Sequence, residues 1–166
     1  RDKDARDTAK IVGLAAIKYG DLSNQATKDY IFDVDRFTSF EGNTGPYILY
    51  TIVRIKSILN RYVEAGGNLE AGEILPASNG SEKNLMLQLS GFGSMIESAF
   101  EEKAPHKICA YIYEVSNAFN SFYHETKILS EENQAQKESY IRLLQLTKRV
   151  LETSIDLLGF EAPDKM

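Results

Sequence analysis

Residues 40–61 read FEGNTGPYILYTIVRIKSILNR, and this stretch largely decides the fold that we predict. A proline in the first turn of a helix leaves no hydrogen bond unmade, so Pro46 fits a helix that begins near Thr44 and stops at the Gly66–Gly67 pair. At about 100° per residue, a set of apolar and aromatic side chains then falls along one side of the helix. This predicted buried stripe consists of Ile48, Ile52, Ile55, Leu59 and Tyr62.

The same helix carries a second group of side chains on another side of its axis. With Tyr47 as the origin, Tyr50, Arg54 and Arg61 fall at about 300–340°, next to Tyr47. Two interpretations of this face stay open on these residues alone. In the first, the tyrosines border the core and the arginines extend into water. In the second, the rings stack on unpaired bases of a nucleic acid and an arginine pairs with phosphate.

Helical periodicity continues through most of the remaining chain. We expect a helix over Asp4–Tyr19 that Gly20 ends, a short helix near Leu22–Thr27 and a loop prone to disorder over 66–81. A helix capped by Ser81 should then run to Phe100, with one apolar face made of Leu85, Leu89, Phe92, Ile96 and Phe100. The next helix, opened by Pro105, carries a predicted core stripe of Ile108, Ile112, Val115, Phe119 and Phe122, and Ser130 and Gly159 should begin and end the last helix. Helices with short connections predict an all-α fold, an antiparallel helical bundle.

Composition narrows the class of protein further. Of the 166 residues, 43% are hydrophobic and 26% charged, as in folded domains rather than disordered chains. The net charge of -5 argues against a protein that coats nucleic acid through bulk positive charge, but not against a local basic strip. No apolar run reaches the roughly 20 residues of a membrane span. The charged start and the single cysteine, Cys109, favour a cytoplasmic protein without a signal peptide or disulfide.

Three stretches of the sequence carry a resemblance to a known family, and they are TKDYIFDVDRFTSFEGNTGPYILYTIVRIKSIL at 27–59, DLSNQATKDY at 21–30 and LLGFEAPDKM at 157–166. They resemble the C-terminal region of arginyl-tRNA synthetases. The resemblance covers nearly the whole chain, and FEGNTGPY is its most specific part. It implies the helical anticodon-binding domain of a class I synthetase, with residues 1–41 as a lead-in from the catalytic domain and 42–166 as the bundle.

The resemblance also implies which residues bind RNA. Carried over position by position, the side chains that contact the anticodon loop of arginine tRNA are Tyr47, Tyr50, Arg54, Tyr123 and Met166. The longer parent would join arginine to its tRNA with ATP and magnesium. The HIGH and KMSK signatures of class I enzymes are absent from these residues, so no catalytic or cofactor-binding residue is predicted in this part.

Other polar or reactive residues carry weaker functional hypotheses. His124 beside Glu125 suits a polar helix face better than acid–base catalysis, because no nucleophile accompanies them. Cys109 beside an apolar stripe suits a buried position. Lys148 and Arg149 suit the negative end of the last helix, or a tRNA phosphate.

Two other functions remain open on the sequence. One is a helical scaffold or protein-interaction domain, and the other is the anticodon-binding domain of a different class I synthetase.

Overall fold

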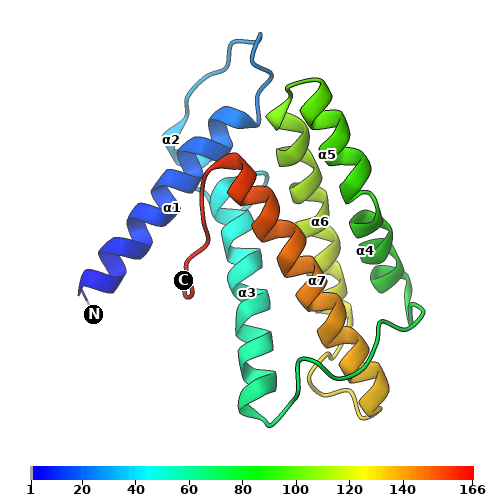
Figure 1. The fold of residues 1–166 in the computed structure, drawn as a ribbon. Coiled ribbons are helices and arrows are strands. Elements are labelled where there is room, and N and C mark those ends of the chain that lie inside the picture. The colour runs from blue at the N-terminus through cyan, green and yellow to red at the C-terminus, as the bar shows by residue number, and fades with distance from the viewer. Residues whose placement is uncertain (1) are drawn as a thin grey trace.

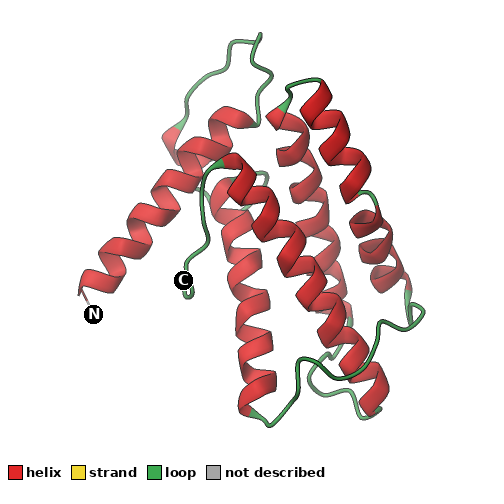
Figure 2. Ribbon diagram, in the orientation of Figure 1, coloured by secondary structure: helices red, strands yellow, loops and turns green. Residues whose placement is uncertain are grey.

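The computed structural model describes residues 2–166, and all of the regular structure within this range is helical (Figure 2). The helices are α1 (Asp2–Leu22), α2 (Val34–Phe37), α3 (Gly45–Glu64), α4 (Gly80–Ser90), α5 (Phe92–Glu101), α6 (Pro105–Glu125) and α7 (Gln134–Leu158). The predicted all-α class is therefore confirmed. None of these helices is long and apolar enough to cross a membrane.

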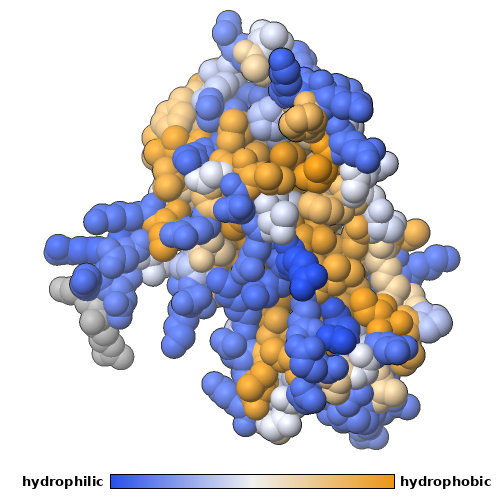
Figure 3. All heavy atoms as spheres, in the orientation of Figure 1, coloured by the Kyte–Doolittle hydropathy of each residue, from blue (hydrophilic) through white to orange (hydrophobic). Residues whose placement is uncertain are grey.

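The long helices form an antiparallel bundle, as predicted. In Figure 1, α3 and α6 run in one direction, whereas α7 and the successive helices α4 and α5 run in the other. Helix α1 crosses the bundle obliquely next to α3, and its N-terminal part projects away from the other helices. Hydrophilic residues cover this projecting part, whereas apolar residues gather where α1 meets the end of α7 (Figure 3).

The core lies between α3, α6 and α7 and includes the stripe predicted on α3. All five residues of that stripe are buried. The stripe predicted on α6 is buried as well, and it comprises Ile108, Ile112, Val115, Phe119 and Phe122. Cys109 is buried beside it, as predicted.

Helix caps follow the chemistry predicted at some ends but not at others. Helix α3 begins next to Thr44 as expected, and the Thr44 hydroxyl caps it by accepting a hydrogen bond from the Tyr47 backbone N–H at 3.2 Å. Gly159, with a φ of 84°, ends α7 as expected. Ser81 and Ser130 were the wrong N-caps, because Asn79 caps α4 and Asn133 caps α7.

The helix predicted over 81–100 is interrupted at Gly91, which separates α4 from α5. The Tyr111 hydroxyl of α6 donates to the Gln88 carbonyl oxygen at 2.8 Å, next to the point where the helix breaks. Phe100, expected on the buried face, is 84% exposed, whereas Phe92 and Ile96 of the same expected face pack against the core.

The first helix is longer than predicted, and the short helix near Leu22–Thr27 does not form. Helix α1 continues through Gly20 to Leu22. Gly20 has a packing role instead, because a Cβ at this position would lie 2.6 Å from the Phe37 ring. Phe37 belongs to the short helix that does form, α2, which the Asp33 carboxylate caps.

The segment predicted as a loop over 66–81 contains no helix before α4, but it is attached to α7. The Leu75 N–H donates to the Ser139 hydroxyl at 2.9 Å, and the Arg142 side chain donates to the Gly72 carbonyl at 3.2 Å. The Gln145 side chain donates to the Leu69 carbonyl, also at 3.2 Å. The expected tendency to disorder is thus opposed by several direct hydrogen bonds to one helix.

We predict that Gly45→Ala destabilises the bundle by at least about 1–3 kcal/mol, the usual range for overpacking. A Cβ at Gly45 would press against the Ala15 carbonyl, so α1 and α3 would have to separate. Gly13→Ala is the matched control, because nothing lies within 4 Å of its added Cβ. It should stabilise α1 by about 0.5–1 kcal/mol. Urea unfolding of both variants measures the difference, and equal stabilities would contradict the predicted close approach.

We also predict that the free energy of unfolding falls as the pH rises from about 9 towards 12. Burial raises the pKa of Cys109 to about 12 and that of Tyr111 to about 12. The unfolded chain loses these protons near the ordinary values, so over this interval the folded state holds more protons. Each such group then lowers stability by up to about 1.4 kcal/mol per pH unit. Urea titrations at several pH values should show a shallower decline for Cys109→Ala, and parallel declines would exclude a contribution from the thiol.

Candidate nucleic-acid interface

Tyr50, Arg54 and Tyr123 come together where α3 lies beside α6. The Arg54 Cζ atom lies 4.7 Å from the centre of the Tyr50 ring and 4.8 Å from the centre of the Tyr123 ring. Tyr50 is one helical turn before Arg54, so the helix itself places these two together. We call Tyr50, Arg54 and Tyr123 the Tyr–Arg cluster. Its two rings and one guanidinium group are chemistry suited to stacking on bases.

Hydrogen bonds connect the cluster to the fourth predicted residue, Tyr47, through Asn120 of α6, and continue from Tyr47 to Asn117 of the same helix. Arg54 Nη1 donates to Asn120 Oδ1 at 2.6 Å, and Asn120 Nδ2 donates to Tyr47 Oη at 3.0 Å. Tyr47 Oη in turn donates to Asn117 Oδ1 at 2.7 Å. Arg54 Nη2 also donates to Tyr50 Oη at 3.1 Å. A continuous polar network therefore joins the two helices at this edge of the core.

Tyr47 and Tyr50 differ in how much of each a ligand can reach. Tyr50 is 42% exposed, whereas Tyr47 is partly buried and its ring packs at a steep angle against Tyr113, with centroids 5.8 Å apart. This burial raises the pKa of Tyr47, although the hydrogen bond from Asn120 opposes the rise. Tyr47 thus connects the helices, and Tyr50 is the more accessible ring.

The Tyr123 ring packs against two other rings of α6, those of Phe119 and His124. It stacks on the buried Phe119 with centroids 6.2 Å apart and an interplanar angle of 27°. His124 lies at 5.4 Å from it and at a steep angle. His124 and Glu125 are both exposed at the end of α6, which agrees with a polar helix face.

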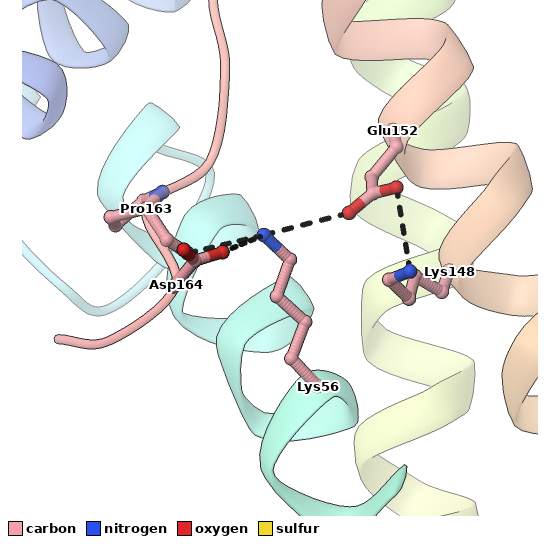
Figure 4. Close-up of polar contacts among 5 residues, drawn as sticks. All are labelled: Lys56, Lys148, Glu152, Pro163 and Asp164. Atoms are coloured by element: carbon pink, nitrogen blue, oxygen red, sulfur yellow. Dashed lines mark hydrogen bonds and ion pairs between the residues drawn. The ribbon is translucent and has the colours of Figure 1, made fainter. Parts of the chain in front are cut away.

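Met166, the fifth predicted residue, lies on the tail that follows α7 and is 42% exposed. The tail is attached to another side of α3, as Figure 4 shows. Lys56 Nζ donates to the Pro163 carbonyl at 3.3 Å and lies 3.4 Å from Asp164 Oδ1. At about 100° per residue, Lys56 lies about 160° around the helix from Arg54. The structure brings four predicted residues together and does not join Met166 to them.

Sequence reasoning missed Asn117 and Asn120. Their signal was present in the stretch NAFNSFY, where two amides three residues apart interrupt an otherwise apolar helix face. Asn120 is also one turn before Tyr123, so the two project in similar directions. A buried or half-buried amide usually has a hydrogen-bond partner. The polar face of α3 carries the side chains that could be that partner.

The prediction that Lys148 and Arg149 interact with the negative C-terminal end of the last helix is wrong. Helix α7 continues to Leu158 and has no basic residue in its last turn, because the helix extends more than two turns beyond them. Lys148 instead pairs with Glu152 at 3.8 Å, and Glu152 also lies 3.7 Å from Lys56 (Figure 4). Both basic residues line a groove of about 590 Å³ between α7 and the loop that follows α3.

No group of three or more His, Cys, Asp or Glu side chains that could hold a metal ion together occurs within residues 2–166.

Comparison with known proteins shows the family of the chain. The sequence pattern of the DALR anticodon binding domain matches residues 48–166, most of the chain. The chain belongs to the DALR anticodon-binding domain family. The matched DALR region contains Tyr50, Arg54 and Tyr123, whereas Tyr47 lies directly before it.

The chain is also similar, over nearly its whole length, to arginine–tRNA ligases. It is 69% identical to that of Agathobacter rectalis over 99% of the chain, and 56% identical to that of Alkaliphilus oremlandii over 96%. It spans only 28% and 27% of those relatives, respectively. Its fold superposes on the arginyl-tRNA synthetase of Thermus thermophilus with a TM-score of 0.87 and 30% identity, over 96% of this chain and 27% of that one.

We predict that Tyr47→Phe lowers the free energy of unfolding by about 1–2 kcal/mol, because it leaves the side-chain oxygen of Asn117 without its donor and removes one of the two acceptors of the Asn120 NH2 group. Tyr50→Phe is the control, since the exposed Tyr50 hydroxyl contacts only Arg54 among the residues described. Its effect should stay within about 0.5 kcal/mol. Urea denaturation monitored by circular dichroism measures both, and equal losses would contradict the distinct roles of the two tyrosines.

Proposed function

We propose that this chain is the anticodon-binding part of an arginine–tRNA ligase and that it binds the anticodon loop of arginine tRNA. The observation that carries the proposal is the position of Arg54 between the Tyr50 and Tyr123 rings at the α3–α6 edge. This arrangement occurs in a DALR-family chain that is 69% identical to an arginine–tRNA ligase over 99% of its length.

The chemistry of the cluster fits a single-stranded loop better than a duplex. Bases of a loop can unstack and lie against aromatic rings, and each such contact contributes about 1–3 kcal/mol. Two rings and one guanidinium group can therefore bind a loop although the whole chain has a net charge of -5. Arg54 supplies positive charge next to the rings, where a loop phosphate would pass.

Each predicted residue has a separate role in this proposal. Tyr50 and Tyr123 stack on bases, and Arg54 interacts with their phosphate or base edges. Tyr47 binds at the inner border of the loop while holding α3 to α6. Met166 contacts the loop from the tail, and this contact requires the loop to extend from the cluster around α3.

The remainder of the longer protein would carry the ligase reaction. The relatives are more than three times as long as this chain, which spans 28% of the first of them. ATP, magnesium and arginine would bind to that remainder, the catalytic domain of the same chain. Residues 1–41 would then connect it to the bundle at 42–166, in a protein of the cytoplasm.

We predict that the chain binds an RNA hairpin carrying the anticodon loop of an arginine tRNA, and that Tyr50→Ala or Tyr123→Ala weakens binding roughly 5- to 150-fold. The loss follows from the stacking that each ring supplies. Binding should also weaken as salt concentration rises, because phosphate contacts release counterions. Fluorescence anisotropy of a labelled hairpin measures both effects.

Tyr30→Ala is the matched control, because Tyr30 has a similar exposed fraction of 39% but lies in the segment between α1 and α2. It should leave affinity within about twofold, as expected for a surface site away from the RNA. If both cluster variants bind as tightly as the unaltered chain, the residue assignment is wrong. If the unaltered chain does not bind the hairpin at all, a scaffold function is favoured instead.

A further inference from the structure

We propose that Asn120 is a positioning residue, a neutral clamp that holds Arg54 between Tyr50 and Tyr123 and leaves its charge available for RNA. This inference rests on the proposed function for its RNA-binding consequence. Its structural basis is independent, because Asn120 contacts three polar side chains of α3. Its partners are Arg54, Tyr47 and Thr51.

The orientation of the Asn120 amide follows from the chemistry of Arg54. A guanidinium group only donates hydrogen bonds, so the oxygen of the amide must face it, at 2.6 Å. The NH2 group is then directed at Tyr47 Oη, at 3.0 Å, and at Thr51 Oγ1, at 3.2 Å. Each of these hydroxyls in turn donates a hydrogen bond to another acceptor. Tyr47 donates to Asn117, and Thr51 donates to the Tyr47 carbonyl oxygen.

This chain of donors has one direction from Arg54 to Asn117. A side chain with a fixed hydrogen-bond direction is held in one rotamer, since turning the Asn120 amide over would place NH2 against the guanidinium. Arg54 is therefore ordered before any RNA arrives. An arginine that is already immobilised loses little further rotamer freedom on binding, which favours affinity.

The clamp is neutral, and this has an electrostatic consequence. No Asp or Glu oxygen lies within 4.0 Å of the Arg54 guanidinium among the side chains described, those of residues 3–166, so its acceptors are an amide oxygen and a phenol oxygen. A carboxylate would hold the guanidinium at least as firmly but would cancel its charge. Asparagine gives the same geometry and leaves the positive charge uncompensated for a phosphate.

Asn117 offers a matched comparison on the same helix. It is one turn before Asn120, it is also half-buried, and it joins the same network through Tyr47. It makes no hydrogen bond to Arg54. Loss of either amide should weaken the α3–α6 edge, but only loss of Asn120 should release Arg54.

The experiment compares Asn120→Ala, Asn117→Ala and Asn120→Asp in the 166-residue chain. Nuclear magnetic resonance of the Arg54 side chain reports its place between the rings, because both tyrosine rings shift its signals. Asn120→Ala should move these signals towards those of a free arginine and weaken hairpin binding about three- to tenfold, which matches the net contribution of one ordinary hydrogen bond. Asn117→Ala should leave the signals in place and affinity within about twofold.

Two further variants test whether the effect passes through Arg54 and its charge. The double variant Arg54→Ala with Asn120→Ala should bind no more weakly than Arg54→Ala alone, because residues that act through one another are not additive. Asn120→Asp should keep the Arg54 signals shifted yet weaken binding, and it should reduce the salt slope by about one phosphate contact. This variant also decides the question if Asn120→Ala fails to fold.

Several outcomes would overturn the clamp. They are unchanged Arg54 signals in Asn120→Ala, equal RNA affinities for Asn120→Ala and Asn117→Ala, additive losses in the double variant, or full affinity in Asn120→Asp. A different result separates the two proposals. If the unaltered chain does not bind the hairpin, the proposed function fails, while the Arg54 signals still establish whether Asn120 positions the guanidinium.

Discussion

The packing of α3 against its neighbours is the constraint on which the rest of the structure depends. One side of α3 buries an apolar stripe in the core, and its N-terminus approaches α1 so closely at Gly45 that no Cβ fits. These contacts fix the rotation of α3 about its axis. Because that rotation is fixed, Tyr50 and Arg54 can only face the edge where α6 contributes Tyr123. The core thus sets the position of the cluster, in which Tyr123 also packs against the core.

The part of the fold that depends on local patterns could be predicted from the sequence. Pro46 and the isoleucine repeat define α3, and Gly159 ends α7, because each acts within one or two helical turns. The features that were missed depend on distant partners. Helix α1 continues through Gly20, on which Phe37 packs, and α4 breaks from α5 next to the point where the Tyr111 hydroxyl contacts Gln88. Periodicity within one helix contains no information about such contacts.

In the candidate site, too, local spacing could be predicted from the sequence, whereas contacts between helices could not. The spacing of Tyr47, Tyr50 and Arg54 on one helix was sufficient to group them, whereas Tyr123 entered only through resemblance to a family. Asn117 and Asn120 could not be assigned, because their partners are on α3 and are identified only once the register of α3 against α6 is known. The tail's attachment at Lys56 likewise depends on how α7 returns to α3. Its position leaves Met166 apart from the cluster.

Net charge is a poor guide to what this surface can bind, and two cations of α3 explain why. Lys56 and Arg54 are two residues apart, yet Lys56 is only 17% exposed in its side chain and lies between the carboxylates of Glu152 and Asp164. Its charge is used within the molecule to hold the tail. Arg54 is held by neutral oxygens of Asn120 and Tyr50, so its field reaches solvent beside two aromatic rings. An acidic chain can therefore present a cationic site wherever the partners of its arginine are neutral.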